Sequence, residues 1–123
     1  MKKLLILLFS LLISFNSYGE WREVARSTSG DTFYVEQNTI RENNGYVYSW
    51  ILIEYAKSSD GMMSSKIYTQ FDCGVFRFKD LAFVSYNQSM GNGEIRNEFT
   101  PPDDWRYPMS KTMDYAVLDF VCD

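Results

Sequence analysis

The sequence contains no histidine and only two cysteines among its 123 residues. Without an imidazole, catalytic triads that use a histidine base are excluded, as are the common zinc sites with histidine ligands. The two cysteines, Cys73 and Cys122, are far apart, whereas redox-active pairs usually have the short Cys-x-x-Cys spacing. The residues therefore give no indication of a catalytic site, a metal site or a cofactor.

Long hydrophobic runs are also scarce, and the only one is too short to cross a membrane. It covers Leu4–Phe15 and follows two lysines. A spanning helix needs about 20 apolar residues, whereas a positive start, a shorter apolar run and small residues before a cleavage point are typical of a secretory signal peptide. We therefore predict cleavage after Gly19, with residues 1–19 as the signal peptide and residues 20–123 as one mature domain without a membrane span.

Basic residues are fewer than acidic residues in this sequence. The chain has 12 Lys and Arg against 16 Asp and Glu, and two of the lysines precede the predicted cleavage point. The mature domain thus has 10 positive and 16 negative side chains, a net charge of −6. Nucleic acid and anionic lipid are recognised mainly through Lys and Arg, so neither is expected as a partner. The charge is compatible with a basic protein partner.

Aromatic residues are abundant, at 17% of the chain, and they favour β structure. Turn signals rich in Gly, Asn, Asp and Ser divide the mature chain at short intervals, which is typical of an antiparallel sheet built from hairpins. We predict six strands, the last from the weakest pattern: Trp21–Ser27, Thr32–Glu36, Tyr46–Lys57, Ser65–Cys73, Val75–Tyr86 and Glu94–Phe99.

Three of these strands carry more detailed signals. The run Tyr46–Lys57 is apolar at both odd and even positions, which predicts a strand covered on both faces. In Ser65–Cys73, the cysteine lies at an alternate position with the apolar residues Ile67 and Phe71. Its side chain is therefore expected to point to the same face of the sheet as theirs, which is the core. The run Val75–Tyr86 changes parity across Lys79 and Asp80, which predicts a β-bulge.

The hydrophobic period changes after Pro108. Ser110 is a candidate N-cap, Asp114 lies where the helix dipole favours negative charge, and apolar residues then recur at helical spacing. The pattern predicts an amphipathic helix over Lys111–Cys122. The expected fold class is therefore α+β, with an antiparallel sheet and one C-terminal helix.

The cysteine pair is expected to form a disulfide. An exported chain enters an oxidising compartment, where two cysteines normally pair. Cys73 ends a strand and Cys122 lies on the predicted helix, so the bond would fasten the helix to one face of the sheet. A redox-active pair is the alternative, and the long spacing disfavours it.

These features together carry a resemblance to a known family. The motifs are "YVEQNTI" at Tyr34–Ile40, "FDC" at Phe71–Cys73, "GNGE" at Gly91–Glu94 and the terminal "VCD", with tryptophans between them. In this order they resemble the surface-adhesin protein E family of Gram-negative bacteria. The resemblance implies a roughly six-stranded antiparallel sheet whose concave side holds a C-terminal helix through a disulfide. It also implies binding of host proteins such as vitronectin and laminin.

Two short segments contain candidate functional residues. Asp103 and Asp104 could form a catalytic carboxylate pair, but adjacent acidic residues in a turn-rich segment are usually solvated. Trp105, Arg106 and Tyr107 are the residue types that dominate protein-binding hot spots. They form a candidate partner-binding site; the alternative is that Trp105 and Tyr107 fold back over the start of the helix.

The predicted function is non-enzymatic binding of a protein partner by a domain exported to the periplasm or the outer cell surface. The partner would be a host matrix or serum protein, or a protein of the bacterial envelope. A periplasmic inhibitor or immunity-type protein that binds a basic enzyme is the second reading, and an enzyme that uses only Asp or Glu is the third. Pairing of two copies through an edge strand is left open.

Overall fold

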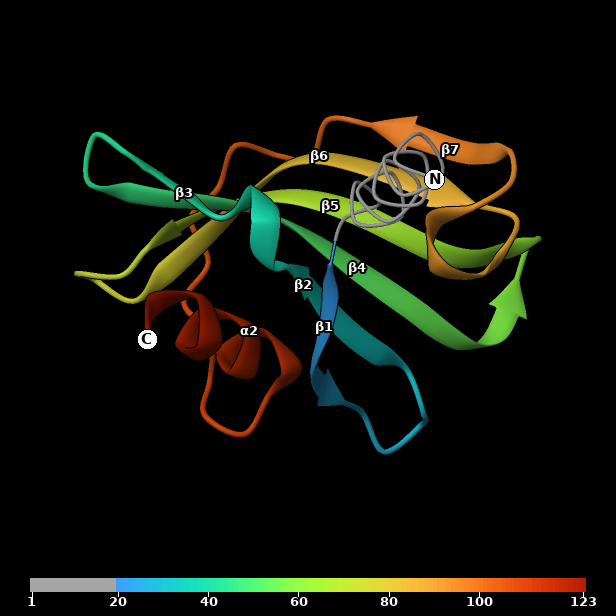
Figure 1. Ribbon diagram of the computed structural model, residues 1–123, viewed down its shortest axis with the longest axis horizontal. Helices are drawn as coiled ribbons and strands as arrows, with labels where there is room; N and C mark the ends of the chain where they lie inside the picture. Colours follow the sequence, from blue (N-terminus) through green and yellow to red (C-terminus); the bar gives the residue numbers. More distant parts are fainter. Residues whose placement is uncertain (1–19) are drawn as a thin grey trace, which may run out of the picture.

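The structure, a computed structural model, describes residues 20–123, so the predicted signal peptide lies outside the described residues. Figure 1 shows one twisted antiparallel sheet with a C-terminal helix packed against it. The strand order is β1-β2-β4-β5-β6-β7, and the short β3 pairs with β4. The elements are β1 (Trp21–Arg26), β2 (Thr32–Glu36), β3 (Arg41–Asn43), β4 (Tyr46–Ser59), β5 (Met62–Asp72), β6 (Arg77–Tyr86), β7 (Ile95–Phe99) and α2 (Met113–Cys122), with 3-10 turns η1 (Gln37–Thr39) and η2 (Ser89–Gly91).

The long hairpin of β4 and β5 forms the centre of the sheet. Its two strands end at the pair Ser59 and Met62, so only Asp60 and Gly61 lie between them. Both residues have positive φ, at 51° and 77°, as a two-residue type I′ turn requires. The hairpin is therefore longer than the sequence predicted, because the strands continue through a polar serine-rich stretch up to the turn.

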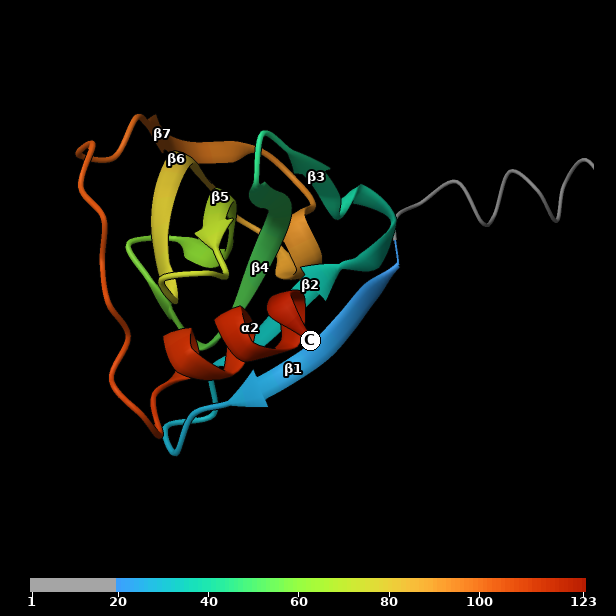
Figure 2. The same cartoon turned by 90° about the vertical axis from the view of Figure 1, so that its left-hand side faces the viewer.

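The centre of β4 is buried on both faces, as predicted for the whole strand, but Tyr46, Tyr48 and Trp50 are only half-buried. Ile51 and Leu52 point to opposite sides of the sheet and are only 5% and 0% exposed. Ile51 belongs to the main core between the sheet and α2, which also contains Val35, Phe71, Phe78, Val117, Leu118 and Val121. Figure 2 shows α2 lying across the sheet on this side, and we call this side the helix face.

The opposite side of the sheet is partly covered by η2. The Ser64 hydroxyl donates a hydrogen bond to the carbonyl of Gln88 at 2.6 Å and accepts one from the Gly91 amide at 2.8 Å. The ammonium group of Lys66 lies over the rings of Trp21 and Tyr86 at 5.7 and 5.4 Å. Leu52 lies on this side and is 0% exposed.

The disulfide joins Cys73 to Cys122, with Cα atoms 5.5 Å apart, and confirms the predicted link between sheet and helix. Cys73 follows β5 directly, at the start of a tight turn. The carboxylate of Asp72 organises this turn by accepting hydrogen bonds from the Val75 amide at 3.2 Å and from Nε of Arg77 at 2.8 Å. The last turn of α2 is therefore bonded to the end of a central strand.

Some predicted boundaries were wrong. The helix begins at Met113 with Thr112 as its N-cap, not at Lys111 with Ser110 as the cap. Lys111 has a φ of 66°, which is not helical, and the Thr112 hydroxyl accepts the hydrogen bond from the Tyr115 amide. Similarly, β6 begins at Arg77 because Phe76 has a φ of 65° in the preceding turn.

The sequence also missed one strand. β3 pairs with the start of β4 across the turn of Asn44 and Gly45. All three of its residues are polar and exposed, so it has no hydrophobic alternation to reveal it. The predicted bulge in β6 is confirmed: Tyr68 pairs with Ala82 and Thr69 with Asp80, which leaves Leu81 as the extra residue.

Candidate functional site

The described part of the chain contains no cluster of three or more His, Cys, Asp or Glu side chains that could hold a metal ion. Between residues 20 and 123, no helix is both long and apolar enough to span a membrane. Asp103 and Asp104 are both exposed, and Asp103 forms an ion pair with Lys79 at 2.7 Å. These two carboxylates are therefore exposed groups of the loop before the helix.

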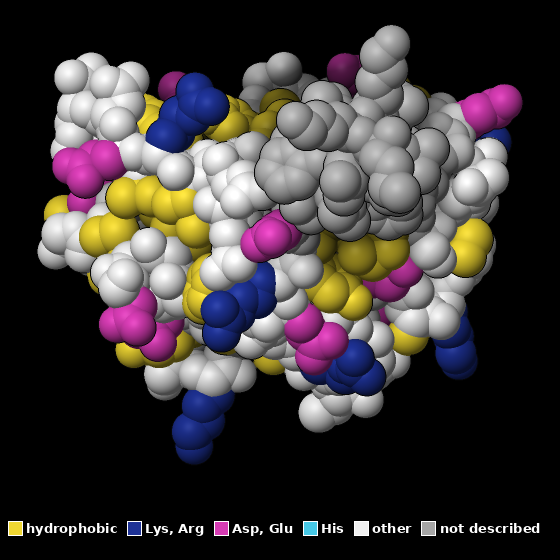
Figure 3. Space-filling view, in the orientation of Figure 1, with side chains coloured by type: hydrophobic (Ala, Val, Ile, Leu, Met, Phe, Trp, Pro, Cys, Tyr) yellow, Lys and Arg dark blue, Asp and Glu magenta, His cyan; other side chains and the backbone are white. Residues whose placement is uncertain are grey.

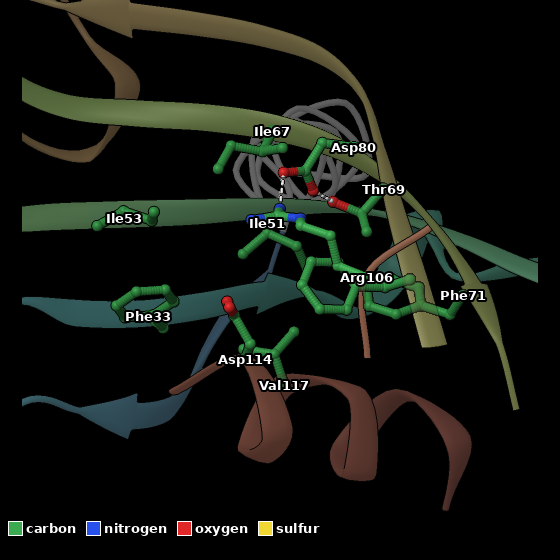
Figure 4. A pocket seen from close by; sticks show the side chains of 11 residues that line it. Phe33, Ile51, Ile53, Ile67, Thr69, Phe71, Asp80, Arg106, Asp114 and Val117 are labelled. Carbon is green, nitrogen blue, oxygen red and sulfur yellow. Dashed lines mark hydrogen bonds and ion pairs between the residues drawn. The ribbon is translucent and has the colours of Figure 1, made fainter. Parts of the chain in front are cut away.

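A small cavity of about 50 Å³ lies between the helix face and α2. Figure 4 shows Thr69 and Asp80 reaching from the sheet toward α2, which contributes Asp114 and Val117 to the opposite wall. Arg106 enters from the segment before the helix and forms an ion pair with Asp80. The remaining walls are mainly apolar, from residues such as Phe33 and Ile53.

The Asp80 carboxylate is the most strongly desolvated acid in this cavity. Burial raises its pKa above the ordinary value of 3.8, Asp114 adds to this effect, and the attraction of Arg106 opposes it. Raised carboxyl pKa values occur at catalytic acids, but here the side chain is already paired with Arg106 and accepts a hydrogen bond from Thr69 at 3.4 Å. Because so small a cavity has no room for a drug-sized substrate, we interpret Asp80 as structural.

The predicted site Trp105–Tyr107 is divided between the two sides of the sheet. Phe78 and Arg106 form an antiparallel bridge, with backbone hydrogen bonds of 2.8 and 3.0 Å. Since neighbouring residues in an extended segment point in opposite directions, Arg106 lies with Phe78 on the helix face. Trp105 and Tyr107 point to the other side. The structure therefore brings Trp105 and Tyr107 together but not Arg106.

One interpretation of the sequence expected Trp105 to cover the start of the helix, but Trp105 lies elsewhere. Its ring lies against Arg77 and Lys79, whose charged groups are 4.1 and 4.6 Å from its centre. The Tyr46 ring is 5.6 Å away. Tyr107 is 62% exposed, and its hydroxyl accepts a long hydrogen bond of 3.4 Å from Arg77. The result is a half-buried indole with an exposed phenol beside it.

Trp105 marks one end of a larger cluster that we call the aromatic face, defined by Tyr46, Tyr48, Trp50, Tyr68 and Trp105. Tyr46, Tyr48 and Trp50 alternate along β4 and so point to the same side. Tyr68 is paired with Trp50 across the sheet, and their ring centres are 5.1 Å apart. All five rings are half-buried, so each retains some access to solvent.

A shallow hollow of about 180 Å³ lies at the end of the aromatic face away from Trp105. It is lined by Thr39, Arg41, Trp50 and Tyr68. The sequence pattern does not predict this hollow, because the rings of a strand covered on both faces are expected to be core residues. The alternation in "YVYSW" was visible, but the missed strand β3 is what places Arg41 opposite Tyr48.

The comparisons with known proteins agree with this architecture. A solved structure of Haemophilus influenzae protein E aligns over 83% of this chain and 83% of its own, with a TM-score of 0.65 and 13% identity. A second crystal form of that protein gives a TM-score of 0.61 over 83% and 86%, also at 13% identity. Protein E from non-typeable Haemophilus influenzae gives 0.57 over 83% and 74%, at 12% identity.

At such low identity these likenesses establish the fold alone. No curated protein matches the chain significantly. The family profile described as surface-adhesin protein E, in contrast, matches residues 21–123, which is nearly the whole of the described domain. The chain therefore belongs to the surface-adhesin protein E family.

Proposed function

We propose that residues 20–123 form an exported, non-enzymatic domain that binds an extracellular host protein through the surface around Trp105 and Tyr107. Membership of a surface-adhesin family supports binding as the class of function. A shared fold does not transfer a ligand, so the contact surface is inferred from the residues of this chain. The observation that carries the proposal is the exposed ring of Tyr107 beside the clamped indole of Trp105.

This arrangement has the physical properties of a binding hot spot. Aromatic residues and arginine supply most of the binding energy in protein interfaces. Trp105 is held by Arg77, Lys79 and Tyr46, so its ring loses little freedom when a partner binds. Tyr107 offers a large flat surface with a polar end, which suits an interface that is apolar at its centre and wet at its rim.

Export is part of the proposal. The residues before Glu20 have the order of a signal peptide, and the disulfide suits an oxidising compartment outside the cytoplasm. We propose that the mature domain resides in the periplasm or on the outer surface of a Gram-negative bacterium. Protease added to intact cells distinguishes these locations, since a surface protein is degraded and a periplasmic one survives.

The binding test compares two single variants of the mature domain against immobilised vitronectin and laminin. We expect Tyr107→Ala to weaken binding at least about tenfold, as truncation of a hot-spot residue does. Met109→Ala is the matched control, because Met109 is a large apolar side chain in the same segment and is 76% exposed. Equal binding by wild type and Tyr107→Ala would contradict the proposed surface.

The alternative function is inhibition of a basic envelope enzyme, for which the charge of −6 is suitable. In Figure 3, acidic and basic side chains are interspersed over the described part of the face in view, so this part of the surface gives no specific support for a basic partner. A pull-down from envelope extract that recovers a basic hydrolase, with no capture of matrix proteins, would favour the alternative. Pairing of two copies through β1 or β7, the two edges of the sheet, remains a further proposal.

A further inference from the structure

The hollow beside Trp50 combines two features that the proposed protein-binding surface does not use. It has half-buried aromatic rings, and the polar residues Thr39 and Arg41 line it beside them. Tyr68 lies opposite Trp50 in the sheet, while Arg41 lies opposite Tyr48 on the neighbouring β3. Paired residues in a sheet point to the same side, so strands β3, β4 and β5 all contribute to one surface.

The rings form a short platform. Tyr68 is 5.1 Å from Trp50 and 6.1 Å from Tyr48, and the planes of the two tyrosines differ by only 23°. None of these three side chains makes a hydrogen bond with another residue of the described range 20–123. Their hydroxyl and indole N–H groups are therefore available at the edge of the platform.

Arg41 adds the most flexible polar group. It is exposed, and within residues 20–123 its guanidinium forms no ion pair. On the same side, Arg77 pairs with Asp72 and Lys79 with Asp103. The ammonium group of Lys66 has no ion pair among the described residues, but it lies over two aromatic rings. A guanidinium has five N–H donors, so Arg41 can donate hydrogen bonds to a ligand without breaking an existing contact.

We infer that this hollow binds a pyranose ring of an extracellular glycan. The C–H groups on one face of a sugar ring carry partial positive charge, and they pack well on the negative face of an aromatic ring. The hydroxyl groups around the ring need hydrogen-bond partners, and Arg41 and the phenols can donate to them. The Thr39 hydroxyl already donates to the Glu36 carbonyl at 3.0 Å, so it can accept a hydrogen bond from the sugar. A volume of about 180 Å³ lies below the range of about 300–1,000 Å³ for drug-sized ligands, so one sugar residue fits and the rest of the chain projects into solvent.

Other ligand classes fit the hollow less well. A purely apolar ligand would leave the guanidinium of Arg41 and the phenols desolvated without partners. A polyanion such as nucleic acid needs several unpaired cations, and only Arg41 is unpaired among the lining residues. The glycan proposal does not rest on the proposed protein contact, because the two sites lie at different places along β4. Tyr46 contacts Trp105 at the proposed protein contact, whereas Trp50 lines the hollow. These two residues are separated by about 13 Å along the strand.

The test uses an array of oligosaccharides that contains neutral hexoses, N-acetylhexosamines and uronic acids, probed with the folded mature domain. We expect at least one pyranose class to bind, and Arg41→Ala to weaken that binding about tenfold. Tyr68→Phe retains the ring and removes only the hydroxyl, so we expect a smaller loss of about threefold. Glu42→Ala is the matched control, since Glu42 is an exposed neighbour on β3 that points to the other side.

Trp50→Ala is expected to abolish binding, and its unfolding curve shows whether the domain remains folded. The proposal is overturned if no glycan binds the wild-type domain at millimolar concentration. It is also overturned if binding persists unchanged in Arg41→Ala and Tyr68→Phe. Enzymatic deglycosylation of vitronectin and laminin separates the two proposals: binding that persists and depends on Tyr107 supports the protein contact alone, and binding lost with the sugars supports the glycan site.

Discussion

Asp72 and Asp80 each pair with an arginine, yet their surroundings shift their pKa values in opposite directions. The hydrogen bond from Arg77, with amides of the following turn, lowers the pKa of Asp72 below 3.8. Burial raises the pKa of Asp80, and Arg106 offsets only part of that effect. The two carboxyl groups therefore make opposite contributions to the pH dependence of stability.

For Asp72, the charged form is favoured in the folded state. Its contribution to stability is fully present above the unfolded pKa of about 4 and is lost as the pH falls through the lower folded value. We expect Asp72→Asn to reduce the free energy of unfolding at neutral pH, with a difference from wild type that shrinks at strongly acidic pH. Urea unfolding curves at a series of pH values measure this, and a constant difference would contradict it.

For Asp80, the neutral form is favoured in the folded state. Wild-type stability therefore decreases as the pH rises from about 4 through the higher folded pKa. Asp80→Asn cannot ionise, so we expect this variant to gain stability relative to wild type across that interval. The same urea series serves as the measurement, with Asp72→Asn as an internal control of opposite sign. Parallel profiles for Asp80→Asn and wild type would show that its burial has no net effect.

At the scale of elements, the start of α2 depends on one side chain. The hydroxyl of Thr112 accepts a hydrogen bond from the Tyr115 amide at 3.2 Å and donates one to the Met109 carbonyl at 2.7 Å. We expect Thr112→Ala to lower the free energy of unfolding by about 1 kcal/mol, the usual effect of removing an N-cap. Thermal unfolding followed by circular dichroism measures the change.

Ser110→Ala is the matched control for this prediction. Ser110 is the cap that the sequence pattern suggested, and it is exposed. Because its hydroxyl makes no hydrogen bond with the described residues around it, we expect a change within about 0.5 kcal/mol, as for ordinary surface substitutions. A larger loss for Ser110→Ala than for Thr112→Ala would mean that the helix begins where the sequence pattern placed it.

The elements that the sequence predicted are those with a strong hydrophobic period. β4 and the helix were predicted because burial requires apolar residues at fixed spacing, and the bulge in β6 was visible as a change of parity. β3 was missed because its exposed polar residues carry no such period. The helix start was misplaced because Ser110 and Thr112 are both acceptable caps, and the φ of Lys111 decides between them.

The candidate site was predicted less well for a related reason. Trp105 and Tyr107 were identified by residue type, but the split from Arg106 depends on the bridge between that segment and Phe78. The hollow at Trp50 depends on pairing among three strands, which neither composition nor spacing specifies. The sequence therefore indicates which single side chains are candidates for binding. Which of them lie together depends on how the strands pair, and this pairing is known only from the structure.

At the scale of the whole molecule, the two sides of the sheet have separate roles. The helix face contains the main core and is closed by α2 and the disulfide. The aromatic face remains partly accessible and carries both proposed contact regions. Because the core is on the opposite side, substitutions at Arg41 or Tyr107 can be made without entering it. This separation is what makes the binding tests interpretable as changes in affinity.

The disulfide is the covalent link that keeps the helix face closed. It connects residues 49 positions apart, and closing a loop of that length stabilises a domain by about 4 kcal/mol in the chain-entropy model. Since small domains have a total stability of about 5–15 kcal/mol, this is a large share. We expect the double variant Cys73→Ser/Cys122→Ser to show a correspondingly lower urea midpoint, with α2 still bound through Leu118 at low urea.

Reduction of the wild-type protein provides the control for that double variant. Wild type with dithiothreitol should reach the midpoint of the serine variant, and dithiothreitol should have no effect on the serine variant itself. The slope of the unfolding transition should change little if the same surface becomes exposed in both proteins. An unchanged midpoint on reduction would show that the apolar contacts of Val117, Leu118 and Val121 alone hold the helix, and that the bond does not stabilise this fold.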